Sequence, residues 1–179
     1  PNRNYKDQNH KPELMVALSD FWLLHGFMPA IALKERLTSL APLHNLLPIF
    51  GMDDYAGLYS HFMHLDQLAA DAILKPLLAL AVEEVAAGKV DKAHPHWWAN
   101  KYYGGIVPAS NIDKGILSIY ILNIVNVPKY HGVFQGAGLL HAYLEGQNIE
   151  LMANSDNVLR GGLTPKHIDI EELLEHIKF

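Results

Sequence analysis

The stretch ILSIYILNIVNV, residues 116–127, is rich in β-branched and aromatic side chains, a composition typical of a β-strand. Two further short runs follow it, KYHGVFQGAGLLHAYL at 129–144 and GQNIELMAN at 146–154, and turn residues bound each of them. We therefore expect successive antiparallel strands from residue 115 onward.

The chain before this stretch has the opposite character, because apolar residues recur at helical spacing from Leu14 to about Ala99. The strongest helix is predicted for DQLAADAILKPLLALAVEEVAAGK, residues 66–89, where Pro76 predicts a kink or a break and Gly88 predicts the end. A helical part followed by a strand-rich part indicates a helical insertion into, or beside, a β-sandwich or barrel.

Two shorter helices are also predicted. Ser19 is placed to cap a helix over DFWLLH, residues 20–25, that Gly26 would end. Near the carboxyl end, Asp169 with Glu172 three places on resembles a capping box for IDIEELLEHI.

These patterns divide the chain into four parts. We expect a loop or strand of the β core at 1–13, a helical insertion with its connector at 14–114, β-strands at 115–166 and a terminal helix at 167–179. The chain begins at Pro1, so we expect it to be part of something longer.

Composition limits the classes of partner. With 179 residues, 50% of them hydrophobic, the chain can bury a substantial core. The net charge of -5 argues against nucleic acid or an anionic membrane as partner. Cysteine is absent, which excludes disulfides and thiolate metal sites and fits a reducing compartment, so we expect a cytoplasmic protein.

Several residues are candidates for chemistry, each with a more ordinary alternative. His141 on a strand is more often a hydrogen-bonded core residue than a ligand, yet with Glu13 it could supply half the donors of a metal site. His94 and His96 flank Pro95 and could hold a metal, although a helix-entry turn anchored by the two following tryptophans is favoured.

The segment VLRGGLTPK, residues 158–166, suggests an anion site. Arg160 on its own is most simply an exposed arginine in a turn. The two glycines after it let the backbone approach a ligand closely, and Lys166 adds a second cation, so an anionic substrate group would fit there.

Three segments together resemble the type I phosphomannose isomerases, the zinc-dependent mannose-6-phosphate isomerases of the cupin superfamily. They are YKDQNHKPE at 5–13, HAYLEG at 141–146 and IELMANSDNVLRGGLTPKHID at 149–169. The resemblance implies an α+β fold in which cupin-type antiparallel β-sandwich strands carry an inserted all-helical segment. Before HAY, the family's Pro-Gly-Glu turn is replaced here by PKYHGVFQGAGLL.

The resemblance also implies roles for individual residues. The metal ligands would be Glu13 and His141, completed by a glutamine and a histidine that precede the NHKPE segment in the family. Substrate and catalytic roles fall on the remaining matches: catalytic Arg160, Lys11, Glu150 and Asp156, and substrate-binding Lys166 and His10.

The function implied is interconversion of mannose 6-phosphate and fructose 6-phosphate through a cis-enediol, with one Zn²⁺ per subunit, in carbohydrate metabolism that leads to GDP-mannose. The expected partner is a small hexose 6-phosphate, and the expected state is a monomer. Without the other two ligands and the family's second cupin half, the chain alone is expected to be inactive. The alternatives are a cupin-like module that binds sugar phosphate without turnover, and a helical interaction surface on a β scaffold.

Overall fold

The computed structural model describes residues 7–164 and 166–179, which form two compact units. The first, here called the strand unit, comprises Pro1–Gly26 and Asn123–Lys178. The second, the helical unit, comprises Phe27–Leu122 with Phe179. The α+β class expected from the sequence is confirmed.

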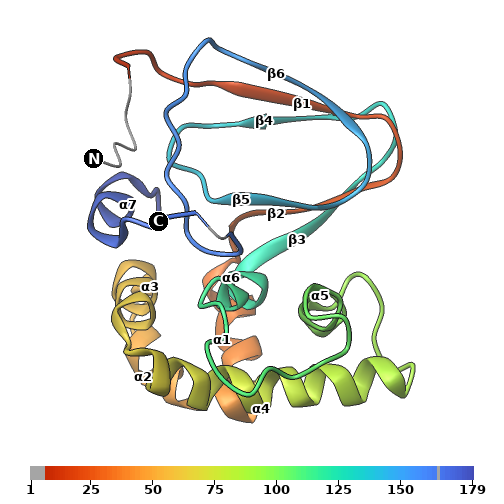
Figure 1. Cartoon of the computed structure of the whole chain (residues 1–179), viewed down its shortest axis with the longest axis vertical. Helices are drawn as coiled ribbons and strands as arrows, with labels where there is room; N and C mark the ends of the chain where they lie inside the picture. Colours follow the sequence, from red (N-terminus) through yellow and green to blue (C-terminus); the bar gives the residue numbers. More distant parts are fainter. Residues whose placement is uncertain (1–6, 165) are drawn as a thin grey trace. The chain divides into compact units, whose positions relative to one another are not determined.

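The strand unit contains two three-stranded sheets, in the orders β4-β1-β6 and β3-β2-β5 (Figure 1). Strand β1 is antiparallel to both of its neighbours, and β2 is antiparallel to β5. The elements are β1 (Glu13–Ala17), β2 (Phe21–Phe27), β3 (Leu122–Val127), β4 (Gly132–Gln135), β5 (His141–Glu145), β6 (Asn148–Met152) and the helix α7 (Ile170–His176).

A small apolar core joins the sheets. Met15 and Ala17 of β1 are buried with Phe21 and Leu23 of β2 and with Val127 of β3. Side chains alternate along a strand, so Glu13 lies on the same side of β1 as Met15 and Ala17. The core therefore directs the carboxylate of Glu13 inward at the start of β1.

The turn between β5 and β6 depends on a glycine. Gly146 has φ +132°, and a Cβ at this position would lie 2.5 Å from Cδ2 of Phe21 and 2.8 Å from the carbonyl oxygen of Asp20. Only glycine combines this backbone conformation with such a close approach.

We expect Gly146→Ala to lower the free energy of unfolding by about 1–3 kcal/mol, because it adds backbone strain and a steric clash. Urea unfolding followed by circular dichroism measures the change. Gly136→Ala is the matched control, since nothing lies within 4 Å of its added Cβ. Equal stability of the two variants would contradict the prediction.

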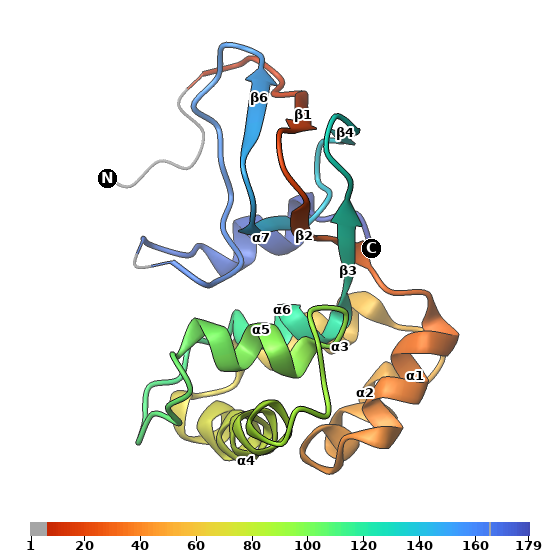
Figure 2. The same ribbon diagram turned by 90° about the vertical axis from the view of Figure 1, so that its right-hand side faces the viewer.

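The helical unit is built around one long helix. Its elements are α1 (Ala30–Ser39), the 3₁₀ helix η1 (Ala41–Leu46), α2 (Leu47–Phe50), α3 (Tyr55–His64), α4 (Gln67–Ala86), α5 (Pro95–Tyr102) and α6 (Ile116–Ile121). Helix α5 lies beside α4 (Figure 2). None of the helices in the described ranges is both long and apolar enough to span a membrane.

Helix α4 follows the sequence prediction at both ends. The Asp66 side chain accepts a hydrogen bond from the Ala69 backbone N–H at 2.8 Å and caps the start. Gly88, at φ +65°, follows the last turn in the left-handed conformation. Pro76 lies inside the helix, which continues through it without a break.

Two local predictions are wrong. Residues 20–25 were expected to be helical, but Phe21–Phe27 is β2, where pairing with β5 outweighs the helical spacing. Residues 116–121 were expected to be strand, but they form α6. Five of its six residues are buried, and such a continuously apolar run does not distinguish a helix from a strand by periodicity.

The expected strands near 122–127, 132–135, 141–145 and 148–152 are present, and so is the terminal helix. The side chain of Asp169 accepts from the backbone N–H of Glu172 at 3.2 Å, as the capping box predicted. The compact helical unit begins at Phe27 and not near residue 14, because β1 and β2 belong to the strand unit.

Candidate active site

A cavity in the strand unit gathers segments that are far apart in the sequence. Its walls come from the NHKPE segment, the end of β4 with the start of β5, the loop after β6, and helix α7. Among the residues that line it are His10, Lys11, Glu13, Gln135, His141 and Arg160. The cavity therefore holds five of the eight residues predicted as site residues.

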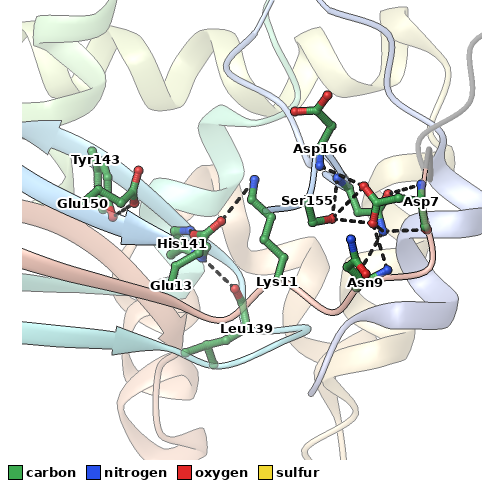
Figure 3. A network of polar contacts seen from close by, with 11 residues as sticks. Asp7, Asn9, Lys11, Glu13, Leu139, His141, Tyr143, Glu150, Ser155 and Asp156 are labelled. Atoms are coloured by element: carbon green, nitrogen blue, oxygen red, sulfur yellow. Dashed lines mark hydrogen bonds and ion pairs between the residues drawn. The ribbon is translucent and has the colours of Figure 1, made fainter. Parts of the chain in front are cut away.

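Glu13 and His141 meet inside this cavity, as Figure 3 shows. The Nε2 atom of His141 lies 3.4 Å from Oε2 of Glu13, and the two side chains are 29% and 14% exposed. On the other side of the ring, Nδ1 lies 2.9 Å from the carbonyl oxygen of Leu139. A carbonyl can only accept, so in the neutral ring Nδ1 carries the hydrogen and Nε2 presents its lone pair to the carboxylate.

Two cationic side chains share the cavity with this pair. The Nζ atom of Lys11 lies 3.3 Å from Oε1 of Glu13. Arg160 lines the cavity from the loop after β6 and is only partly exposed. Positive charge is thus concentrated here in a chain whose net charge is negative.

The other three predicted residues lie outside the cavity lining. Oε1 of Glu150 accepts a hydrogen bond from the hydroxyl of Tyr143. Asp156 is exposed, and its carboxylate points away from the hydrogen-bonded network (Figure 3). Lys166 is also exposed, and its backbone N–H donates to Oγ1 of Thr164, which itself lines the cavity.

Comparison with known proteins identifies the same group that the motifs resemble. Residues 1–30 match the family model "Phosphomannose isomerase type I, catalytic domain". The chain is 36% identical over 178 residues to mannose-6-phosphate isomerase of Shigella flexneri, covering 99% of this chain and 44% of that protein. It is 32% identical over 198 residues to the Schizosaccharomyces pombe enzyme, covering 46% of it.

Comparison with solved structures gives the same result as the sequence comparisons. A mannose 6-phosphate isomerase bound with zinc and yttrium superposes with a TM-score of 0.77 at 32% identity, over 98% of this chain and 43% of that one. The apo form from Salmonella typhimurium gives a TM-score of 0.78, also at 32% identity, over 99% of this chain and 44% of that one. Over nearly its whole length the chain is similar to type I phosphomannose isomerases. It spans less than half the length of these phosphomannose isomerases.

Three residues in or beside the cavity were not singled out from the sequence. His25 lies opposite His141 in the β2–β5 register, and burial lowers its pKa. Gln135 is 2% exposed, lines the cavity and lies beside His25 and Tyr143. Burial, with the hydrogen bond to Glu150, raises the pKa of the Tyr143 hydroxyl.

Asp7 ties together two segments of this site. Its carboxylate accepts from the backbone N–H of Asn9 at 2.9 Å and from that of Asp156 at 3.1 Å. It also accepts from Oγ of Ser155 at 3.0 Å and from Nδ2 of Asn157 at 3.2 Å (Figure 3). These bonds, led by the one from Asn9, hold the pKa of Asp7 below its usual value.

We expect Asp7→Ala to lower kcat/KM for sugar-phosphate isomerisation by the full-length protein by about tenfold to a hundredfold, because the segment carrying Lys11 loses its anchor to the loop carrying Arg160. A coupled fructose 6-phosphate assay measures the change. Asp20→Ala, at an exposed acid away from the cavity lining, is the control and should keep full activity. Wild-type kinetics in Asp7→Ala would show that this anchor does not position the site.

Proposed function

We propose that the full-length protein is a metal-dependent aldose–ketose isomerase that interconverts mannose 6-phosphate and fructose 6-phosphate. The observation that carries the proposal is the meeting of Glu13 and His141, 128 positions apart in the sequence (141 − 13), beside Lys11 and Arg160 in one cavity. The relatives are curated as mannose-6-phosphate isomerases, which supports this substrate.

Glu13 and His141 fit a divalent cation. With Nδ1 donating to Leu139, the imidazole nitrogen and the carboxylate oxygen that face each other at 3.4 Å are both acceptors, so a cation between them relieves their repulsion. Nitrogen and oxygen donors suit zinc, the metal bound in one related structure. Zinc held by these residues would supply positive charge that polarises a substrate oxygen.

Two cations would stabilise the negative charge that develops when a proton leaves carbon next to a carbonyl. The positively charged guanidinium of Arg160 would stabilise an enediolate oxygen. Lys11 is the acid–base candidate that the cavity favours, because Glu150 and Asp156 lie outside its lining. The substrate phosphate is expected near Lys166. Thr164, two residues before it, lies in the cavity wall.

The decisive experiment is a coupled assay of mannose 6-phosphate isomerisation by the full-length protein, before and after chelator treatment. We expect turnover that chelation removes and zinc restores. Binding of mannose 6-phosphate without turnover, in the zinc-loaded protein, would instead support the binding-module alternative. The cytoplasmic location and the monomeric state expected from the sequence remain predictions.

A further inference from the structure

The His94-Pro95-His96 motif lies in the helical unit and takes no part in the cavity described above. It forms the helix-entry turn that the sequence favoured, because His94 is the N-cap of α5 and its Nδ1 accepts from the backbone N–H of His96 at 3.3 Å. The alternative interpretation, a metal-binding pair, is not excluded by this cap. The structure adds a third donor to the two histidines.

That donor is Glu84, near the end of α4. Its Oε2 atom lies 2.8 Å from Nδ1 of His96. Glu84, His94 and His96 each offer a ligand atom, and these three atoms lie within 4.8 Å of one another. Two ligands of a tetrahedral zinc ion lie about 3.4 Å apart, so the side chains would rotate to close the remaining distance.

The cluster is also incomplete in its hydrogen bonding. His96 is 1% exposed, and its Nε2 atom is buried without a partner in the part of the chain that the structure describes. The hydroxyl of Tyr120, whose ring centroid lies 5.7 Å from that of His96, is likewise buried and unpartnered there. Buried polar groups normally have hydrogen-bond partners, so these two unpartnered groups leave the cluster able to bind a ligand.

We propose that Glu84, His94 and His96 form a second metal site, which binds a divalent cation of the zinc class and leaves further positions open to water. Two imidazoles and one carboxylate are a donor set that zinc uses in open sites. Glu84, with a side chain 33% exposed, gives the ion a route in from solvent.

One charge opposes the cation. Arg36 acts electrostatically on both His94 and His96 and helps to lower their pKa values. It would repel a divalent ion as well, while the single negative charge of Glu84 attracts it. We therefore expect a site weaker than a closed structural zinc site, one that fills from added metal.

The test is a Co²⁺ titration of the full-length protein carrying His141→Ala, which removes a ligand from the other candidate site. Visible absorption reports cobalt held by imidazole and carboxylate. We expect about one equivalent to bind at micromolar concentration, and Zn²⁺ to displace it. The Glu13→Ala background provides an independent repeat.

The variants then assign the site. His94→Asn keeps a side-chain acceptor at the helix cap and removes the imidazole, and Glu84→Gln keeps the shape and removes the charge. Each is expected to weaken Co²⁺ binding about tenfold or more, because a ligand matters at least as much as a residue that orients one. His61→Asn, at an exposed histidine of α3, is the control and should change nothing.

Two results would overturn the proposal. One is the absence of micromolar Co²⁺ binding in both backgrounds, which would leave Glu84 and His96 as a hydrogen-bonded pair only. The other is unchanged affinity in His94→Asn and Glu84→Gln with native helix content by circular dichroism. Neither result depends on isomerase activity, so the proposed function can fail or succeed separately.

Discussion

His141→Ala is expected to weaken zinc binding at the Glu13 site, and the isomerase activity of the full-length protein, by at least about a hundredfold. The substitution removes the lone pair that faces Oε2 of Glu13 and the ring that Leu139 orients through its carbonyl. Loss of the hydrogen bond that orients the His141 ring would by itself reduce the affinity for zinc. Loss of the ligand nitrogen would reduce it further. Metal content after dialysis and the coupled assay measure the two effects separately.

The matched control is His131→Ala. His131 is also a histidine whose Nδ1 contacts a backbone carbonyl, that of Lys129 at 3.3 Å, but it is exposed in the turn before β4 and lies outside the cavity lining. The His131→Ala variant should bind metal and turn over substrate like the wild type. Full metal content and activity in His141→Ala would remove His141 from the ligand set.

The sequence singled out Glu13 and His141, which meet in the cavity and whose role as metal ligands stays a prediction, more readily than it indicated the shape of the site. Glu13 and His141 could be named because Glu13 ends one specific motif and His141 begins another. A motif identifies its residues even when the strand register is unknown. Gln135 could not be named in this way. It lies opposite Glu13 only because β4 pairs with β1 in one register, and strand register is set by tertiary packing.

The same limit explains the errors in secondary structure. Residues 20–25 combine apolar spacing with a capping serine, and only pairing with β5 makes them a strand. Helix α6 is buried on nearly every side, so its sequence lacks the polar face that would have marked a helix. By contrast, α7 carries its own cap, Asp169, and α4 is followed by Gly88, and local signals of this kind were sufficient.

Arg160 was recognised for its charge, but its placement depends on contacts that the sequence does not reveal. The loop that carries it has no regular secondary structure, and Asn157 near its start donates from Nδ2 to the backbone carbonyl oxygen of Asp7 at 3.0 Å. The loop is thus held against the NHKPE segment, which also carries Lys11. This arrangement anchors the start of the loop that carries Arg160, and a charge held in place there would stabilise a developing oxyanion without reorganisation.

Arg160→Ala is expected to lower kcat by about a hundredfold or more and to change KM much less, because the lost interaction forms mainly in the transition state. Arg160→Lys should recover part of kcat, since it restores the charge without the planar pair of donors. Lys129→Ala, at an exposed cation outside the cavity lining, controls for the change in net charge and should match the wild type. A change in KM alone would assign Arg160 to substrate binding, and unchanged kinetics would remove it from the reaction.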